Sequence, residues 1–343
     1  RNLQSCYFLA MKGRIIDFLR KNPGNIVLTS HINPDGDAIG SALGFAHYLQ
    51  GQGFNVNVIF PNQPSIPLRS SLGYYSSFVH IDQQDSNKTK KIISQANTLF
   101  ALDYNISSRV GAGMSELIDN FSGTRILVDH HESPDHSFDY MYSLTSKSST
   151  CEMIFDLIEN DGGAVDIACA DNLLMGLITD TGSFKFPVTS SRTHEVAGKL
   201  LELGAQPSVV HDRLFDNNPK SRILILGRVL SNIVITEDSS VAILWISSTD
   251  LNELNYQPGD TEGIVNQGLG IKGVKMSVFI REDSVGSLKL SFRSKGDVSV
   301  NDYSRKHWQG GGHKNASGGL SELTIQETID KVKSTYKEVV IDD

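Results

Sequence analysis

The segment 25–47 places imidazole and carboxylate groups directly after an apolar run. The run, Ile-Val-Leu-Thr, is typical of a buried strand, and the Asn-Pro-Asp-Gly that follows is typical of a turn. Apolar residues then recur at helical spacing, so a helix is predicted to begin there with Asp37 as its N-cap. His31, Asp35 and Asp37 are therefore expected where a strand passes into a helix, the usual ligand-binding end of an open α/β sheet.

Similar groups follow two further apolar runs and one helical stretch. They are Asp103, Asp129, His130, His131 and Asp180. Taken alone, Asp180 is better explained by a polar turn at the end of a helix, and a capped surface turn explains His31 as well as a metal site does. The recurrence of such groups beyond successive strands instead indicates one shared site, because the carboxyl ends of parallel strands meet at one edge of a sheet.

The ligand types in this set favour divalent metal. Imidazole and carboxylate groups without thiolate suit Mn²⁺, Mg²⁺, Fe²⁺ or Co²⁺ better than a structural zinc site. The carboxylates can offset about four positive charges, which predicts two ions, and two ions roughly 3.5–4 Å apart serve displacement at phosphorus. A calcium-binding EF-hand is excluded, because Ile39 stands where the third oxygen ligand is needed.

The composition sets limits on the class of protein. With 343 residues, 39% hydrophobic and 20% charged, the chain is long enough for two domains of ordinary globular type. No apolar run approaches the length of a membrane span, and the three cysteines form no paired motif, so a cytoplasmic location without membrane contact is expected. The net charge of −8 argues against long duplex nucleic acid as a partner.

The order of patterns predicts an α/β fold with two domains. Short apolar runs alternate with helical patterns in the first part, which indicates a doubly wound parallel sheet over 1–190. A helix is predicted at 7–20, near the start of this domain. Glycine and prolines interrupt a helical pattern at 191–222, which is interpreted as a linker, and the β-rich remainder, 223–343, is predicted as a smaller α/β domain.

The second domain contains a basic stretch that ends in a glycine run. From Lys272 to Lys314 there are nine Lys or Arg against four Asp or Glu, which favours a small anionic ligand. Gly-Gly-Gly-His-Lys at 310–314 is either a flexible turn or a place where backbone N–H groups approach a phosphate. It is not a Walker A loop, because the required Gly-Lys-Ser/Thr spacing is absent.

These motifs, in this order, resemble those of the DHH phosphoesterase family across nearly the whole chain. The matching stretches are His31-x-x-Pro34-Asp35-Gly36-Asp37, Leu102-Asp103, Asp129-His130-His131, Asp180 in Ile-Thr-Asp-Thr-Gly, and Gly311-Gly312-His313-x-x-Ala316-x-Gly318. Within the family, the chain is most similar to two-domain oligoribonucleases that also act as 3′,5′-bisphosphonucleotide (pAp) phosphatases.

The resemblance implies a role for each matching residue. His31 and Asp35 would hold one metal ion, Asp37, His130 and Asp180 the other, with Asp103 bridging both. His131 would face the substrate phosphate, and Asp129 would orient a histidine. The residues that would bind substrate are Arg293, Ser294, Gly311, Gly312, His313 and, with less support, Arg109.

The activity implied is attack of a metal-bridging hydroxide on phosphorus, with Mn²⁺ as the favoured ion. The second domain would close over the first and select RNAs of about two to five nucleotides, or pAp, over long strands. A homodimer is left open. The alternatives are a phosphodiesterase for c-di-AMP or linear pApA, a RecJ-like single-strand exonuclease, a family II-like pyrophosphatase, and a nucleotide-sensing module without turnover.

Overall fold

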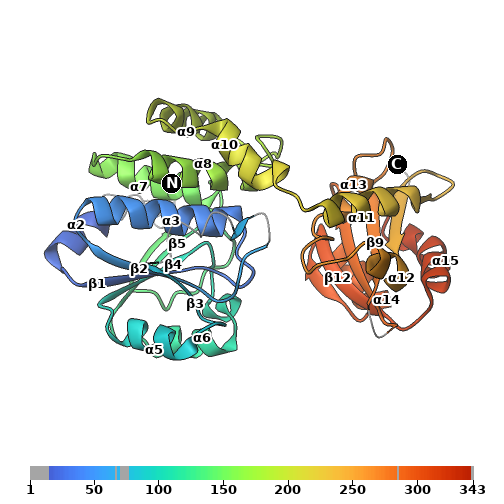
Figure 1. Ribbon diagram of the computed structural model, residues 1–343, viewed down its shortest axis with the longest axis horizontal. Helices are drawn as coiled ribbons and strands as arrows, with labels where there is room; N and C mark the ends of the chain where they lie inside the picture. The colour runs from blue at the N-terminus through green and yellow to red at the C-terminus, as the bar shows by residue number, and fades with distance from the viewer. Residues whose placement is uncertain (1–14, 66–67, 70–76, 284–285, 341–343) are drawn as a thin grey trace. The chain divides into compact units, whose positions relative to one another are not determined.

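The computed structural model describes residues 15–65, 68–69, 77–283 and 286–340, and the chain divides into two compact units after Asn217 (Figure 1). The helix predicted over 7–20 lies partly outside the described residues. Its described part belongs to α2 (Ile15–Lys21). Among the described helices, none combines the length and apolar character that crossing a bilayer requires.

The first unit is built on a sheet of six parallel strands in the order β3-β2-β1-β4-β5-β6. The strands are β1 (Asn25–Thr29), β2 (Asn55–Phe60), β3 (Val79–Ile81), β4 (Thr98–Leu102), β5 (Thr124–Asp129) and β6 (Tyr140–Ser143). The central strands β1, β4 and β5 are buried at most positions, as expected for parallel strands that are covered on both faces.

Helices cover both faces of this sheet (Figure 1). On one face are α3 (Gly36–Gly51), α7 (Thr150–Asp161) and α8 (Ile167–Asp180), and on the other α5 (Ser86–Ser94) and α6 (Ala112–Asp119). Alternate residues of each strand enter the two cores: Leu28 packs with the first set of helices and Val27 with the second. The predicted doubly wound α/β architecture is confirmed.

The segment predicted as a linker contains regular helices. They are α9 (Ser191–Glu202), α10 (Pro207–His211), the π-helical turn η3 (Asp212–Asp216) and the start of α11 (Lys220–Ser231). Val196 and Leu200 of α9, together with Val210 of α10, are buried in the core beside α8. These helices therefore belong to the first compact unit, and α11 to the second.

The second unit has a mixed sheet in the order β11-β12-β10-β9-β8-β7. Its strands are β7 (Val234–Ile235), β8 (Val241–Ile246), β9 (Met276–Glu282), β10 (Leu288–Ser294), β11 (Gly311–His313) and β12 (Ala316–Ser321), and only β8 and β9 run parallel.

Helices lie on both faces of this second sheet. One face packs on α14 (Val300–His307) and α15 (Ile325–Thr335) around Trp308. On the other face, α11, α12 (Ser248–Glu253) and α13 (Val265–Gly268) form a separate core with β8 and β9. The second unit is therefore a smaller α/β unit, as predicted.

Candidate metal centre

The site is formed where β1, β4 and β5 end. These strands are neighbours in the first sheet, and the chain order reverses between β1 and β4, which is the point where open α/β sheets bind ligands. Asp103 directly follows β4, Asp129 is the last residue of β5, and His31 lies two residues after β1. The sheet therefore delivers these side chains to one edge.

The turn after β1 is fixed by paired amides. Asn62 Oδ1 accepts from the Asn33 backbone N–H at 2.6 Å, and Asn62 Nδ2 donates to Asn33 Oδ1 at 2.9 Å. Asp35 then caps α3, because its Oδ1 accepts from the backbone N–H groups of Asp37 and Ala38, each at 3.1 Å. The prediction of Asp37 as N-cap is wrong: the helix begins at Gly36, and Asp37 lies in its first turn.

Asp37 is completely buried and is held by the N-terminus of α7. The backbone N–H groups of Thr150 and Cys151 donate to its two carboxylate oxygens at 2.6 and 2.9 Å. Close packing of α3 on α8 depends on glycine, because a Cβ at Gly176 would lie 2.6 Å from Asp37 Oδ1 and one at Gly40 would lie 2.4 Å from a backbone oxygen. Asp37 is thus fixed by three helices.

Two groups of three potential ligands lie side by side. One consists of His31, Asp35 and Asp103, and the other of Asp37, His130 and Asp180; within each group the ligand atoms lie within 4.8 Å of one another. His130 Nε2 is 3.2 Å from Asp180 Oδ2 and 3.9 Å from Asp37 Oδ2. The structure therefore brings together all six residues that the resemblance assigns to metal, divided as it implies.

His31 and His130 each direct Nε2 at the carboxylates of the cluster. Nδ1 of His31 lies 2.9 Å from the Ile32 carbonyl oxygen, and Nδ1 of His130 lies 3.3 Å from that of Lys147. A proton on Nδ1 satisfies these carbonyls, which leaves Nε2 with its lone pair directed into the cluster. This is the arrangement that metal-binding histidines require.

Asp103 joins the two groups. Its Oδ2 is 3.4 Å from His31 Nε2, while its Oδ1 is 3.5 Å from His130 Nε2. The Thr150 hydroxyl donates to the same Oδ1 at 3.0 Å. Asp103 itself has a φ of 63°, an uncommon backbone conformation for an L-residue.

The electrostatics of the cluster show competition between buried carboxylates. Burial, together with Asp103 and Asp180 nearby, raises the pKa of Asp37 well above its usual range, and burial raises the pKa of Asp180 to about 6. Burial would lower the pKa of each histidine, but the neighbouring carboxylates raise the pKa of His31 to about 10 and that of His130 to about 12. Without a cation, the cluster retains protons that limit its negative charge.

Divalent cations fit this donor set. The groups offer imidazole nitrogen and carboxylate oxygen, and no Lys or Arg in the described part of the chain forms an ion pair with them. Cations bound there would replace the retained protons and pair with the buried carboxylates.

His131 lies beside the cluster but is engaged differently. Its Nδ1 is 2.7 Å from Asp129 Oδ1, and its backbone N–H donates to Asp129 Oδ2 at 3.0 Å. The same Nδ1 is 3.8 Å from Asp103 Oδ1, so the ring lies next to the shared carboxylate. Because Asp129 occupies Nδ1, Nε2 is the nitrogen left for a substrate, and the side chain is 30% exposed.

Arg109, the remaining predicted site residue of the first unit, lies next to the loop that contains His31. It belongs to the 3₁₀ turn η2 (Ser107–Val110), and its carbonyl oxygen accepts from the Ile32 backbone N–H at 2.8 Å. Its side chain is half-buried. The structure therefore brings Arg109 to the edge of the metal cluster through its backbone.

The glycine run in the second unit forms a strand rather than an anion-binding loop. The N–H groups of Gly310 and Gly312 donate to the Ser304 carbonyl oxygen and to Asn301 Oδ1, at 3.2 and 2.9 Å. Neither of these two N–H groups is free to bind a phosphate, so the interpretation of the run as a phosphate-binding loop does not hold for them. The strand ends at His313, whose side chain lies outside the described residues.

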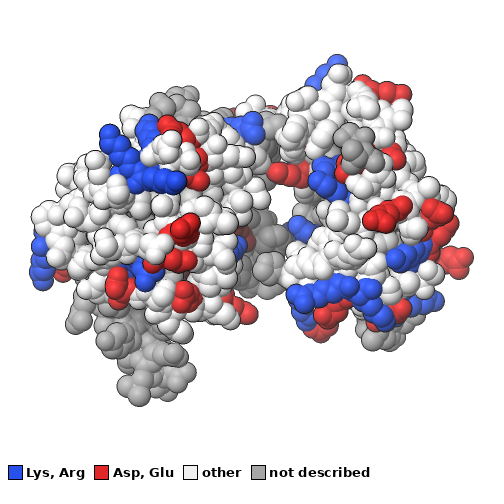
Figure 2. Space-filling view, turned by 90° about the horizontal axis from the view of Figure 1, so that it is seen from below, with Lys and Arg blue, Asp and Glu red and all other residues white. Residues whose placement is uncertain are grey.

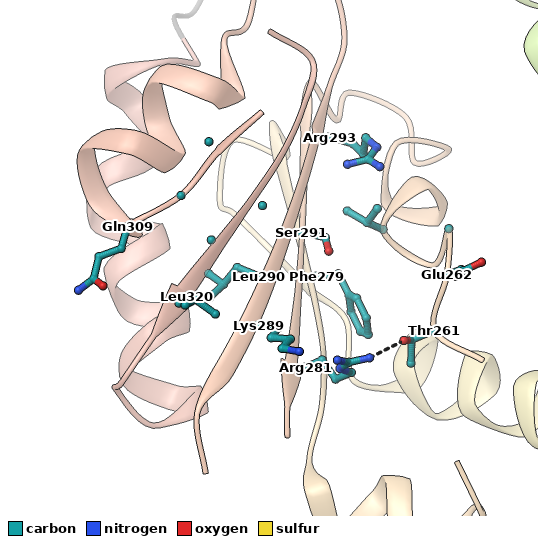
Figure 3. A pocket seen from close by; sticks show the side chains of 16 residues that line it. Thr261, Glu262, Phe279, Arg281, Lys289, Leu290, Ser291, Arg293, Gln309 and Leu320 are labelled. Atoms are coloured by element: carbon teal, nitrogen blue, oxygen red, sulfur yellow. Dashed lines mark hydrogen bonds between the residues drawn. The ribbon is translucent and has the colours of Figure 1, made fainter. Parts of the chain in front are cut away.

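Arg293 and Gly311 line one hollow of the second unit, shown in Figure 3. Arg293 donates to the Phe292 carbonyl oxygen, and burial lowers the pKa of its guanidinium. Ser294 is committed to the fold, because its hydroxyl donates to the Val298 carbonyl oxygen and accepts from Asn315. Of the predicted substrate-binding groups, Arg293 thus has the side chain best placed for a ligand.

Thr150 is a site residue that sequence reasoning missed. The sequence pattern at 150–158 predicts only a capped amphipathic helix, and α7 does begin at Thr150. The signal that could have identified it is the polar run Ser-Ser-Thr immediately before the apolar face, because a helix N-terminus stabilises carboxylates.

Comparison with protein families gives two matches. The model described as the N-terminal domain of the DHH family matches residues 25–177, and the one described as the DHHA1 domain matches residues 238–342.

Two relatives illustrate the range of activities among similar proteins. The bifunctional oligoribonuclease and PAP phosphatase NrnA of Thermus thermophilus is 30% identical over 94% of this chain and 93% of its own length. The cyclic-di-AMP phosphodiesterase GdpP of Bacillus subtilis is 26% identical over 92% of this chain but only 48% of its own length.

Two solved structures share the fold. An exopolyphosphatase-related protein from Bacteroides fragilis has a TM-score of 0.88 and 31% identity, with coverage of 95% of this chain and 96% of that one. RecJ of Thermus thermophilus has a TM-score of 0.51 and 13% identity, and covers 96% of this chain with 52% of its own length.

Proposed function

This chain belongs to the DHH family and is a hydrolase of phosphoester bonds, and from that premise we propose that it cleaves short oligoribonucleotides to mononucleotides and pAp to AMP. The Thermus thermophilus relative, matched over nearly its whole length, carries both activities in its name. The observation that carries the proposal is the six-residue His and Asp cluster with His131 beside it.

Members of the family depend on metal, and the two ligand groups fit a pair of divalent ions, of which we propose Mn²⁺, with Mg²⁺, Co²⁺ or Fe²⁺ as substitutes. When bound, such ions supply Lewis acidity and lower the pKa of water to near neutrality. His31 and Asp35 would hold one ion, Asp37, His130 and Asp180 the other, and Asp103 would be shared.

His131 is proposed as the catalytic acid. Asp129 accepts a hydrogen bond from Nδ1–H and orients the ring, so that Nε2 is the nitrogen that can donate a proton to the leaving ester oxygen. A charged imidazole also stabilises negative charge on the phosphoryl group as the bond breaks.

In the second unit, Arg293 is proposed to bind a substrate phosphate. A guanidinium offers two parallel N–H donors to phosphate oxygens, and Arg293 forms no ion pair with a described carboxylate. Gly311 also lines the hollow, while hydrogen bonds of Ser294 and Gly312 hold the surrounding backbone. His313 and Arg109 remain proposed substrate contacts.

Short substrates are favoured over long ones by the charge distribution. The net charge of the chain is −8, and on the face shown in Figure 2 basic and acidic side chains are interspersed. Binding of long nucleic acid depends on neutralising many phosphates, which such a surface does poorly.

The test compares wild type, His131→Ala and His136→Ala in Mn²⁺ on pAp and on a labelled RNA dinucleotide. His136 is an exposed histidine on the same loop, so its replacement controls for loss of an imidazole. We expect wild type and His136→Ala to hydrolyse both substrates, and His131→Ala to lose at least about 100-fold in kcat while still binding Mn²⁺.

Turnover of c-di-AMP or long single-stranded DNA, with neither pAp nor the dinucleotide consumed, would overturn the substrate assignment. Full activity of His131→Ala would remove this residue from the mechanism.

A further inference from the structure

The hollow that contains Arg293 extends along an open face of the second sheet. Its volume is about 680 Å³. Strands β9, β10 and β12 form one wall, and the chain around Thr261 and Glu262, before α13, faces them (Figure 3). The hollow is therefore a trough within the second unit, larger than one phosphate requires.

Three cations line this trough. Lys289, Ser291 and Arg293 occupy every second position of β10, so they lie on one face of the strand. The third cation, Arg281, is directly opposite Lys289 on β9. None of the three cations forms an ion pair with a carboxylate in the described chain. Glu262, on the facing wall, is the one acidic residue among the lining residues described.

Arg281 is positioned by neutral groups. Its Nη1 donates to the Tyr256 hydroxyl at 2.8 Å and to the Thr261 hydroxyl at 3.2 Å, and its guanidinium lies over the Tyr256 ring. The charge is thus oriented without being neutralised. Lys289, its cross-strand partner, is exposed.

The Lys289–Arg281 pair is unfavourable for the fold by itself. Like charges directly opposite each other in an antiparallel pair destabilise a sheet, whereas opposite charges stabilise it. An anionic ligand bound between the two side chains would offset this repulsion.

We propose that this trough binds the sugar-phosphate backbone of the RNA nucleotides beyond the one held at Arg293, an inference that rests on the proposed function. Arg293 and Lys289 are four positions apart on β10, about 14 Å at ~3.4 Å per residue. In duplex DNA the phosphates of one strand follow one another every ~3.4 Å along the helix axis, so a span of about 14 Å is long enough for contacts to more than one phosphate.

Two further residues that line the trough, Gly318 and Leu320, leave room for RNA and offer it an apolar contact. Gly318 lies opposite Ser291, and a Cβ there would meet only the Leu290 carbonyl oxygen, at 3.6 Å. Packing therefore does not require glycine at this position, but a side chain would occupy the trough. Leu320, which is 50% exposed, adds an apolar surface for bases or sugars.

The test uses Lys289→Glu and Gly318→Leu, with Lys272→Glu as a control. Lys272 is an exposed lysine of the same unit outside the trough, so its variant carries the same change of charge. Binding of a labelled, hydrolysis-resistant phosphorothioate RNA pentanucleotide to the full chain in Mn²⁺ is measured by fluorescence anisotropy at several salt concentrations.

We expect both trough variants to bind the pentanucleotide at least tenfold more weakly than wild type and the control. For Lys289→Glu, the slope of log affinity against log salt should fall by ~0.7 for each phosphate that the variant no longer neutralises. Its melting temperature should equal or exceed that of wild type, because the introduced carboxylate would pair with Arg281, and this separates weaker binding from misfolding.

Turnover measurements distinguish a failure of the trough proposal from a failure of the proposed function. If wild type cleaves RNA and pAp, the ratio of kcat/KM for the pentanucleotide to that for pAp should fall about tenfold in both trough variants. If wild type cleaves neither, the proposed function fails, but the binding measurement still decides the trough. Equal pentanucleotide affinity of wild type, Lys289→Glu and Gly318→Leu would overturn it.

Discussion

Replacement of Thr150 by valine isolates one hydrogen bond of the metal centre. Valine keeps the shape of threonine but lacks the hydroxyl that donates to Asp103 Oδ1 at 3.0 Å. The backbone N–H of residue 150 still donates to Asp37, because that bond does not depend on the side chain. The variant therefore changes the support of the shared carboxylate and leaves the support of Asp37 intact.

The magnitude follows from the charge of the acceptor. A hydrogen bond to a charged group contributes about 1.5–3 kcal/mol, and about 1.4 kcal/mol corresponds to tenfold in an equilibrium constant. Thr150→Val should therefore weaken Mn²⁺ binding by about 10- to 100-fold, the range found when groups that orient metal ligands are removed.

Isothermal titration of Mn²⁺ into wild type, Thr150→Val and Thr150→Ser measures this effect directly. Serine restores the hydroxyl, so Thr150→Ser should bind Mn²⁺ within a few-fold of wild type. A Thr150→Val variant with wild-type Mn²⁺ affinity would refute the reasoning, and equal weakening in both variants would assign the effect to packing of the methyl group instead.

The remaining predictions concern the ionic network behind the metal centre. Lys147 Nζ lies 2.8 Å from Glu152 Oε1 and 2.7 Å from Asp156 Oδ2, so Lys147→Met should leave buried carboxylates without this cation and cost about 3 kcal/mol of unfolding free energy, measured by urea denaturation at pH 7. An unchanged urea midpoint would contradict this. Burial would raise the pKa of Glu152, but hydrogen bonds from Lys147 and Ser148 hold it below its ordinary 4.5. Glu152 therefore stabilises the fold above about pH 4.5, and this contribution is lost as the pH falls through its lowered pKa. The melting temperature should accordingly fall on acidification below pH 4.5, and less steeply in Lys147→Met; parallel pH profiles would show that Glu152 is not responsible.

The first unit could be predicted from sequence because its signals are local. Buried parallel strands appear as apolar runs, and Asp103 and Asp129 stand directly at the ends of β4 and β5. Since the strands are parallel and adjacent, the positions along the chain already imply that these carboxylates share one edge.

Partners distant in the chain could not be predicted in this way. The contact of the Thr150 N–H with Asp37 joins residues 113 positions apart, and although Ser-Ser-Thr indicates a helix N-terminus, neither segment specifies which carboxylate it meets. Likewise, the glycine run at 310–314 left a phosphate-binding loop open as one of two interpretations, whereas the Gly312 N–H donates to Asn301 through a tertiary contact. The register that opposes Lys289 to Arg281 also emerges only from strand pairing.

The two amides that hold Asp37 come from the backbone of residues 150 and 151, which has a consequence for how this chain can change over time. Side chains at these two positions can be exchanged without removing either donor, provided that the helix still begins there. Only proline lacks the N–H group. The two hydrogen bonds to Asp37 are thus insensitive to most side-chain changes at residues 150 and 151, whereas the hydrogen bond to Asp103 requires the hydroxyl of residue 150.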